Sequence, residues 1–201
     1  DWLYKMFGID AELLIDHAWG YETCRMSDIK NYHSEEHSLS NGQVLMRNYS
    51  FEEALVIVRE MTDNLVLDLF EKGLVTSSLT LWIAYDHRYE HEASKGTVKL
   101  ERESNSSKKI IDAVEDLYLR IADRYTGIRR IEVCANRVAP ESYVQYSLFD
   151  DPKQTDKERH LQEAVLNVKQ RYGKNAIMRG SNLLECSTYR ERNEQIGGHR
   201  A

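Results

Sequence analysis

The stretch Gly42–Asp86, GQVLMRNYSFEEALVIVREMTDNLVLDLFEKGLVTSSLTLWIAYD, contains the pattern that decides the fold. Its centre predicts a long helix, because Ser50 and Glu53 form a capping box at the start and Gly73 follows the end. Apolar residues recur along this helix at helical spacing, namely Phe51, Leu55, Val58, Leu65 and Leu69. The residues on either side of the helix predict strands.

The strand after the helix, residues 75–86, alternates between apolar and polar positions, with Leu79, Leu81, Ile83 and Tyr85 on one face. The chain then continues with a strand over 95–103, a helix over 106–125 and a strand over 128–137. The core stripe of this second helix is Ile110, Val114, Leu117 and Ile121. The order β-α-β-β-α-β predicts an α+β fold of the split-βαβ, ferredoxin-like type, with a four-stranded sheet and two helices on one face.

The sheet face opposite the two helices is expected to be open. Because successive side chains of a strand point to opposite faces, the residues of this open face follow from parity. They are Gln43, Arg47, Thr80, Trp82, Thr97, Lys99, Arg130 and Glu132. A tryptophan and several cations on an uncovered sheet indicate a binding platform, and a solvated face with no partner is the alternative.

Shorter elements flank this unit. Residues 10–19 predict a helix capped by Asp10 and ended by Gly20, and residues 21–37 read as a linker. A further helix is expected over 156–172, ended by Gly173, with an aligned apolar stripe of Leu161, Val165, Val168 and Tyr172. The remaining C-terminal residues have little periodicity.

The composition excludes several classes. No run approaches the roughly 20 apolar residues that a membrane helix needs. Cys24, Cys134 and Cys186 are far apart and odd in number, which favours a reducing, cytosolic protein over a disulfide framework. Net charge is −6 for the chain, although residues 153–201 hold 10 basic and 6 acidic side chains. Affinity for DNA must therefore come from local patches and not from the overall field.

Catalytic motifs are missing from the sequence. There is no phosphate-binding loop, no nucleophile elbow and no convincing carboxylate pair for magnesium, so the chain is expected to be neither an enzyme nor a metal or cofactor carrier. His87 and His91 are the nearest candidates for metal ligands, but they fall in a hairpin where polar residues are expected. An RNA-recognition domain is an alternative for this fold, yet the strand that starts at Lys95-Gly96 lacks the stacking aromatics.

Several segments resemble the C-terminal part of a Y-family translesion DNA polymerase of the UmuC/DinB kind, Gram-positive type. FGIDAELLIDHAWG resembles the end of its thumb, SLSNGQVLMRNYSFEEA the entry into its little finger, and RYGKNAIMRGSNLLE and ERNEQIGGHRA its C-terminal tail. The resemblance implies a thumb end over 1–24, a linker over 25–37, a little finger over 38–138, a clamp-binding segment over 139–152, and a C-terminal helix and tail over 153–201. The palm and fingers, with their Mg²⁺-binding carboxylates, would lie upstream, so this chain would not polymerise.

In that family the little finger grips the primer-template duplex through its phosphates, without sequence preference. Carried over by position, the DNA contacts would come from Ser38, Ser40, Arg47, Lys99, Arg102, Arg130 and Arg137. Arg102 falls on the core-side parity, and Glu101 and Glu132 lie on or near the same surface. A module that only docks proteins is the alternative, and the salt dependence of binding would distinguish the two.

The segment Gln145-Tyr146-Ser147-Leu148-Phe149 resembles the pentapeptide by which bacterial polymerases bind the sliding clamp. Leu148 and Phe149 would fill an apolar pocket, while the Gln145 amide and Ser147 would fix the register. Breakers on both sides, Ala139-Pro140 and Asp151-Pro152, would keep the segment accessible. The resemblance thus implies a monomeric cytoplasmic, nucleoid-associated protein of the SOS response and DNA repair, with duplex DNA and the sliding clamp as partners and no membrane.

Overall fold

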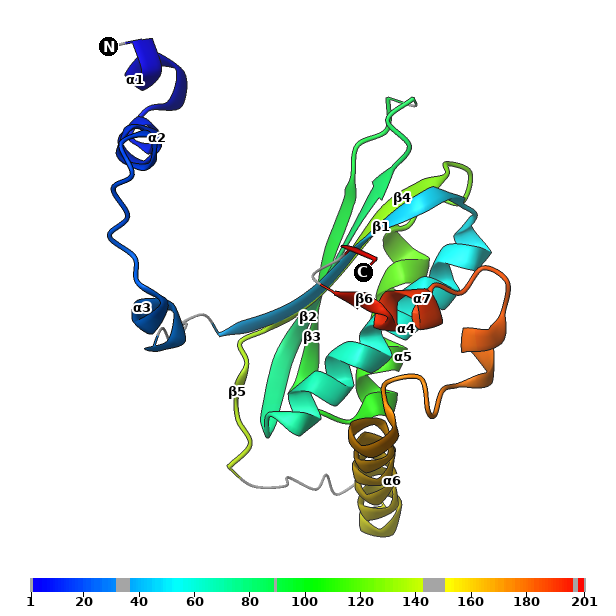
Figure 1. The fold of residues 1–201 in the computed structure, drawn as a ribbon. Helices are drawn as coiled ribbons and strands as arrows, with labels where there is room; N and C mark the ends of the chain where they lie inside the picture. Colours follow the sequence, from blue (N-terminus) through cyan, green and yellow to red (C-terminus); the bar gives the residue numbers. More distant parts are fainter. Residues whose placement is uncertain (1, 32–36, 89, 143–150, 197–198, 201) are drawn as a thin grey trace. The chain divides into compact units, whose positions relative to one another are not determined.

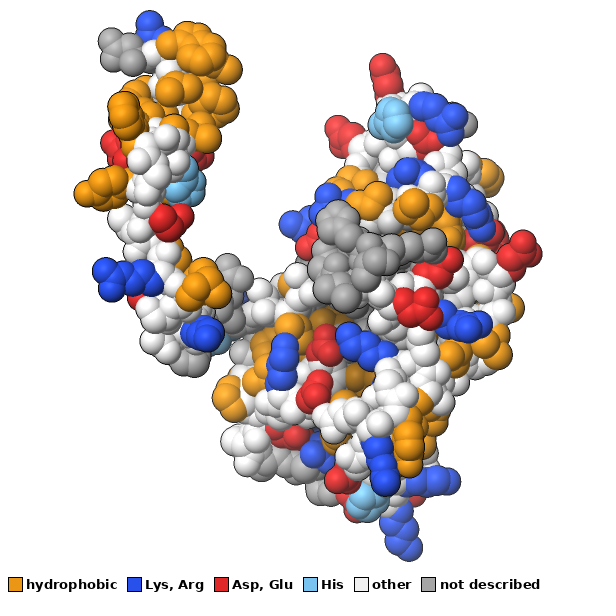
Figure 2. Space-filling model, in the orientation of Figure 1, with side chains coloured by type: hydrophobic (Ala, Val, Ile, Leu, Met, Phe, Trp, Pro, Cys, Tyr) orange, Lys and Arg blue, Asp and Glu red, His pale blue; other side chains and the backbone are white. Residues whose placement is uncertain are grey.

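A computed structural model describes residues 2–31, 37–88, 90–142, 151–196 and 199–200. The chain divides into two compact units, residues 1–36 and residues 37–201. The smaller unit contains the helices α1 (Trp2–Phe7), α2 (Asp10–Ala18) and α3 (Met26–Asn31). Its only buried residue in these helices is Ala11, and Figure 2 shows hydrophobic side chains gathered over α1 and α2.

The larger unit contains the expected β-α-β-β-α-β order followed by a tail (Figure 1). Its central elements are β1 (Ser38–Tyr49), α4 (Phe51–Glu71), β2 (Leu74–Tyr85), β3 (Ser94–Ser104), α5 (Ser107–Ile121) and β4 (Ile128–Asn136). The elements that follow are β5 (Ala139–Pro140), α6 (Pro152–Tyr172), the 3₁₀ helix η1 (Gly180–Leu183), α7 (Tyr189–Asn193), β6 (Gln195–Ile196) and β7 (His199–Arg200).

The four long strands are ordered β1-β4-β2-β3, and each neighbouring pair is antiparallel. It follows that β1 is parallel to β2 with β4 between them, and β3 is parallel to β4 with β2 between them. Each helix therefore connects two parallel strands that a third strand separates, which confirms the split-βαβ prediction. The ferredoxin-like type has β1 and β3 at the centre of the sheet, whereas here they are the two edge strands, so that part of the prediction is wrong. β5 adds a short pairing with the start of β2.

The core lies between the sheet and the layer formed by α4 and α5 (Figure 1). Ser50 caps α4 with the predicted capping box, and the predicted stripes of both helices contribute to this core. Gly96 allows the close approach of α5 to β3, because a Cβ at this position would lie 2.8 Å from Leu117 Cδ1 and 3.0 Å from Ile121 Cγ2. The glycine of the predicted third strand is thus explained by packing.

Several element boundaries differ from the sequence predictions, among them the start of β1, which is Ser38 and not Gly42. α5 ends at Ile121 and not near residue 125, because the Asp123 carboxylate accepts hydrogen bonds from the backbone N–H of Tyr125 and Thr126 and closes a turn. The short helix α3 lies inside the expected linker. The expected break at Ala139-Pro140 is the short strand β5.

α6 begins at Pro152, four residues before the predicted start. The Asp151 side chain accepts from the backbone N–H of Lys153, and proline fits the first position of a helix because it needs no N–H donor there. The predicted apolar stripe is only partly buried, since Val165 and Val168 are half-buried whereas Leu161 is 63% and Tyr172 66% exposed. The buried residue of α6 is Gln162, which donates to the backbone carbonyl of Asn105.

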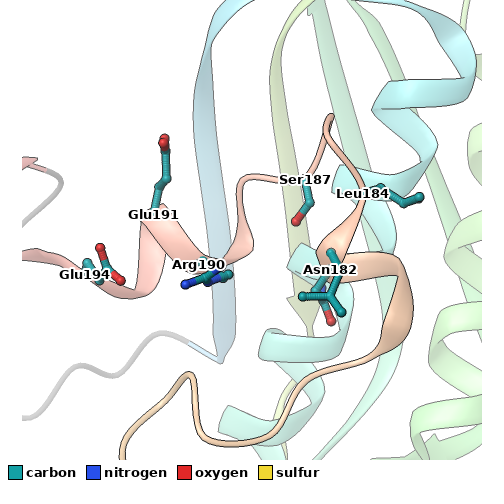
Figure 3. A pocket seen from close by; sticks show the side chains of 7 residues that line it. Asn182, Leu184, Ser187, Arg190, Glu191 and Glu194 are labelled. Atoms are coloured by element: carbon teal, nitrogen blue, oxygen red, sulfur yellow. The ribbon is translucent and has the colours of Figure 1, made fainter.

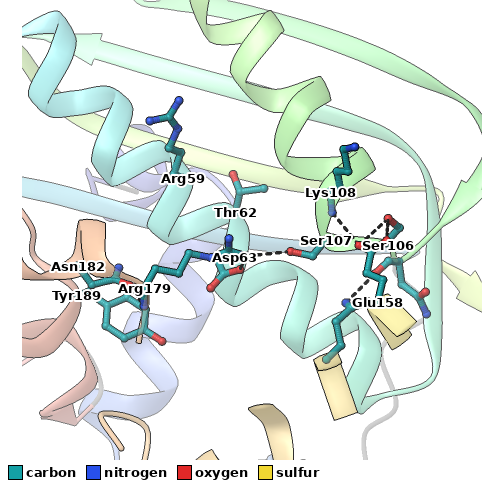
Figure 4. A network of polar contacts seen from close by, with 12 residues as sticks. Arg59, Thr62, Asp63, Ser106, Ser107, Lys108, Glu158, Arg179, Asn182 and Tyr189 are labelled. Atoms are coloured by element: carbon teal, nitrogen blue, oxygen red, sulfur yellow. Dashed lines mark hydrogen bonds and ion pairs between the residues drawn. The ribbon is translucent and has the colours of Figure 1, made fainter. Parts of the chain in front are cut away.

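The tail, residues 151–196, packs against α4, and polar contacts link it to α4 and to the start of α5 (Figure 4). Arg179 Nη2 lies 2.6 Å from Asp63 Oδ1 of α4. The Glu158 carboxylate of α6 accepts from Ser106 Oγ and from the backbone N–H of Lys108, so it caps the N-terminus of α5. The pattern of apolar residues gave no signal for this docking because the contacts are between charged and polar groups.

The centre of the docking surface is the carboxylate of Glu60, which is 2% exposed on α4. It accepts hydrogen bonds from Asn182 Nδ2 at 3.1 Å, from Ser187 Oγ and from the backbone N–H of Thr188 at 3.3 Å. Burial raises the pKa of Glu60, and burial lowers the pKa of the neighbouring Arg192 guanidinium. Both shifts have the same cause, which is the loss of water around these groups where the tail covers α4.

Candidate nucleic-acid interface

The sheet face that α4 and α5 leave uncovered is made of four rows, each running across the strands. The registers of the three strand pairs define the rows. From β1 across β4 and β2 to β3, they are Ser38–Asn136–Ser78–Lys99, Ser40–Cys134–Thr80–Thr97 and Gly42–Glu132–Trp82–Lys95, and the fourth, Val44–Arg130–Ala84, ends at β2. We call these residues the open face.

Most side chains of the open face are small, so the surface is shallow. Three cations, Lys95, Lys99 and Arg130, and one carboxylate, Glu132, are its charged groups. Phosphate oxygens are bound by lysine and arginine side chains and by hydroxyl and backbone donors. The composition of the open face therefore suits a phosphate backbone better than an apolar partner.

The bulkiest group of the open face is Trp82. The Arg130 guanidinium carbon lies 5.1 Å from the centroid of its ring, which is a cation–π contact. Arg130 Nη2 lies 3.7 Å from Glu132 Oε2, with the two side chains about half and one third exposed. This separation permits attraction between the charges but is too long for a hydrogen bond.

Hydrogen bonds between side chains fix the middle rows. Thr80 Oγ1 lies 2.8 Å from Thr97 Oγ1 and accepts from Asn136 Nδ2 at 2.9 Å. Cys134 Sγ lies 3.3 Å from Asn136 Oδ1. Burial raises the pKa of the Cys134 thiol, which keeps it protonated at neutral pH.

The structure brings four of the seven predicted DNA contacts together on the open face. Ser38 and Lys99 lie at the two ends of one row, Ser40 lies in the next, and Arg130 lies beyond them. Lys95 also lies on the open face, although it was not among the DNA contacts predicted from the sequence. Its place on the register, directly opposite Trp82, was available from the strand parity of β3.

Two residues predicted to lie on this face lie elsewhere. Gln43 pairs with Ile131 on the helix-covered side, where its amide oxygen accepts from Thr188 Oγ1 of the tail. Arg47 follows a register shift in β1 and forms two hydrogen bonds, of 2.6 and 2.9 Å, with the Glu53 carboxylate. These predictions were wrong because extra residues in β1 break the alternation of its side chains.

Arg102 and Arg137 lie at the margins of the sheet. A register shift in β3 between Lys99 and Ser104 interrupts the alternation, and Arg102 is exposed although its parity predicted the core side. Arg137 is exposed directly after β4 and has a backbone φ of 51°. The predicted clamp-binding residues Gln145, Ser147, Leu148 and Phe149 fall outside the described residues.

The histidines of the β2–β3 hairpin have structural partners. His91 Nε2 lies 2.9 Å from Asp123 Oδ2, and its ring packs 4.3 Å from that of Tyr85. Asp86 accepts from Arg88 and Asn48, and these bonds, chiefly that from Arg88, hold its pKa well below the usual range. In the described part of the chain no three His, Cys, Asp or Glu side chains gather as a metal site.

Two hollows lie on the tail side of the larger unit. One, of about 330 Å³, lies between η1 and α7, and Figure 3 shows Leu184, Arg190 and Glu191 among its lining residues. The other, of about 560 Å³, is lined by residues of α4, α5 and α6, such as Ile111 and Leu161, and by Ile177, Met178, Arg179 and Tyr189. Of the described helices, none has the length and apolar character needed to cross a membrane.

Charges of both signs are mixed on the side of the larger unit that is seen in Figure 2. Figure 2 shows Lys and Arg side chains interspersed with Asp and Glu on the visible side. Local groups such as the open face, and not a single field of one sign, must therefore provide any attraction for nucleic acid.

Comparison with known proteins identifies relatives along the whole chain. The chain is 25% identical to DNA polymerase IV 2 of Bacillus subtilis (strain 168) over 203 aligned residues, covering 99% of this chain and 47% of that protein. It is 21% identical to DNA polymerase IV 2 of Halalkalibacterium halodurans, covering 83% of this chain and 40% of that protein. The chain thus spans about half the length of the curated relatives that it matches.

Among solved structures, a complex of beta-clamp processivity factor and the little finger domain of PolIV matches 57% of this chain and 100% of that chain, with 12% identity and a TM-score of 0.40. A Y-family DNA polymerase chimera, Dbh-Dpo4(243-245)-Dbh, matches 69% of this chain and 38% of that chain, with 16% identity and a TM-score of 0.39.

The model of the impB/mucB/samB family C-terminal domain matches residues 36–148, which is more than half of the chain. This match and the polymerase relatives confirm the resemblance to the C-terminal part of a Y-family DNA polymerase. The matched range contains the complete split-βαβ sheet and its open face. The chain therefore belongs to the impB/mucB/samB family, and its larger unit contains the C-terminal domain of that family.

Proposed function

We propose that this chain is the part of an error-prone translesion DNA polymerase that grips primer-template DNA and tethers the enzyme to the sliding clamp. The observation that carries the proposal is the open face, where Lys95, Lys99 and Arg130 stand on one uncovered surface of the family domain. The family match and the polymerase relatives support the same assignment.

The grip would act through the phosphate backbone. Lys99 and Lys95 lie on the edge strand β3 and Arg130 on the central strand β4, so the cations lie on both sides of β2. Between them are hydroxyl and amide groups that can donate to phosphate oxygens. Contacts of this kind carry no sequence information, which suits a protein that must accept any template.

Polymerisation itself would reside in a longer protein. The chain matches less than half of each curated relative, and its described residues include no carboxylate cluster for two metal ions. We expect the chain by itself to lack nucleotidyl transfer. Primer extension with magnesium and all four nucleotides checks this, and extension that survives repurification would contradict it.

The tether would be the segment Gln145–Phe149, which lies between β5 and α6 in the sequence. Two adjacent apolar side chains can share one pocket, and the glutamine amide can both donate and accept. Replacing Leu148 and Phe149 together with alanine should abolish clamp binding, because truncating one buried anchor costs about 2 kcal/mol or more, some thirtyfold in affinity. Calorimetry with the purified clamp measures this, and retained affinity would place the tether elsewhere.

The decisive experiment for the grip is a fluorescence anisotropy titration of primer-template duplex at two salt concentrations. We expect a dissociation constant of about micromolar or weaker, and a steep loss of affinity with salt. A duplex of unrelated sequence should bind equally well. Binding that is insensitive to salt would overturn the grip and favour a module that docks proteins.

A further inference from the structure

The open face has a carboxylate at its centre, and the proposed grip does not use it. Glu132 lies on the central strand β4, between Gly42 of β1 and Trp82 of β2. Gly42 has no side chain, and the nearest atoms to a Cβ built there belong to Glu132, at 3.7–4.0 Å. The carboxylate therefore stands beside an empty position on a shallow surface.

This carboxylate does not hold a cation in place. Arg130 is positioned by its contact with the Trp82 ring, and its Nη2 is 3.7 Å from Glu132 Oε2, beyond hydrogen-bonding distance. Elsewhere in the protein, ion pairs with an orienting role are shorter, such as Arg47 with Glu53 at 2.6 Å and Arg159 with Glu141 at 2.7 Å. Glu132 therefore acts on its surroundings by its charge.

We propose that Glu132 is an affinity-limiting residue, whose negative charge at the centre of the open face keeps the DNA grip weak. The inference rests on the proposed DNA-binding role of this face. A phosphate that approaches Arg130 also approaches Glu132, so attraction by the arginine is partly cancelled. Of the three cations on the face, Arg130 is the one whose charge is reduced in this way.

A low intrinsic affinity for DNA is sufficient when the protein is also tethered to the sliding clamp. A tethered binding surface meets its target at an effective concentration in the millimolar range for a short flexible linker, so it needs little intrinsic affinity. A low intrinsic affinity makes occupancy of DNA depend on the tether and permits rapid release when the tether is lost. The negative charge of Glu132 would thus make the occupancy of DNA depend on the tether.

The test is the substitution Glu132→Gln, which removes the charge and keeps the shape of the side chain. Anisotropy titration of primer-template duplex should show affinity higher by about fivefold at low salt, from the loss of a repulsion between exposed charges. The gain should shrink as salt screens the charges. The matched control is Glu163→Gln, which makes the same change in net charge at an exposed position of α6 on the tail side.

The outcomes separate this inference from the proposed function. If Lys99→Glu with Arg130→Glu weakens binding while Glu132→Gln leaves it unchanged or weakens it, the face binds DNA but Glu132 does not limit affinity. If Glu163→Gln raises affinity as much as Glu132→Gln, the effect is one of net charge and the inference is also overturned. If the double charge reversal has no effect on DNA binding, the proposed function of the face itself fails.

Discussion

Glu60 and Glu132 are the same residue type, each with an arginine nearby, and the protein places them in opposite surroundings. Glu60 is buried under the tail, accepts hydrogen bonds from three tail residues and has Arg192 as its neighbour. Glu132 stands on the open face, 3.7 Å from Arg130, with its carboxylate accessible to solvent.

The difference lies in what each carboxylate can influence. A buried carboxylate affects stability, because its donors lose water on folding and have no substitute when it is removed. An exposed carboxylate contributes little to stability, but its field reaches whatever binds beside it. The helical side of the sheet is therefore specialised for holding the tail, and the open side is available for a partner.

The largest expected effect is on the buried side. Glu60→Ala leaves Asn182, Ser187 and the backbone N–H of Thr188 without their acceptor, and we expect the protein to lose about 3 kcal/mol of unfolding free energy. Urea denaturation measures the loss, and limited proteolysis should show faster cleavage in residues 173–196. The control is Glu163→Ala at an exposed position of α6; equal behaviour of the two variants would refute the assigned role of Glu60.

The next effect concerns the open face. Lys99→Glu with Arg130→Glu should weaken binding to all duplex sequences alike, by at least about tenfold, because two phosphate contacts become repulsive. The urea midpoint should stay close to that of the parent, since both side chains are exposed. An unchanged binding isotherm would show that DNA is held by another surface. A large loss of stability would contradict the view that residues of the open face affect binding and not stability.

The stability of the protein should depend on pH through the Glu60 carboxyl group. Burial raises its pKa above the usual 4.5, so the folded protein binds this proton more readily than the unfolded chain. Its contribution to stability is therefore complete below about pH 4.5 and is lost as pH rises through the folded pKa. Compared with Glu60→Gln, the parent should lose stability as the pH rises above about 4.5, and parallel pH profiles of the two proteins would argue against this.

The smallest effect is expected from the exposed part of the tail contact. Arg179 and Asp63 form an ion pair of 2.6 Å in which the arginine side chain is 56% exposed. Arg179→Ala should cost about 0.5 kcal/mol, because solvent and salt weaken a pair of this kind. A loss as large as that of Glu60→Ala would mean that burial does not decide which tail contacts matter.

The sequence by itself determined the β-α-β-β-α-β order, the helical core stripes and the cap at Ser50. These features depend on local periodicity and on hydrogen bonds between residues close in the chain, so they are visible in a single sequence. The same alternation correctly assigned Thr80, Trp82, Thr97, Lys99, Arg130 and Glu132 to the open face. The family resemblance also came from the sequence, and the family match confirmed it.

Only the tertiary structure decided the strand order, the register shifts and the docking of the tail. Arg47 and Arg102 follow irregularities in β1 and β3, and a period of two cannot continue through added residues. The tail packs through hydrogen bonds of Glu60, Gln162 and Arg179 with residues more than 50 positions away in the chain. Such bonds leave no periodic signal in the sequence, so this docking could not be predicted from it. Local pattern thus predicts which elements form, whereas the positions of polar groups in space decide which elements meet.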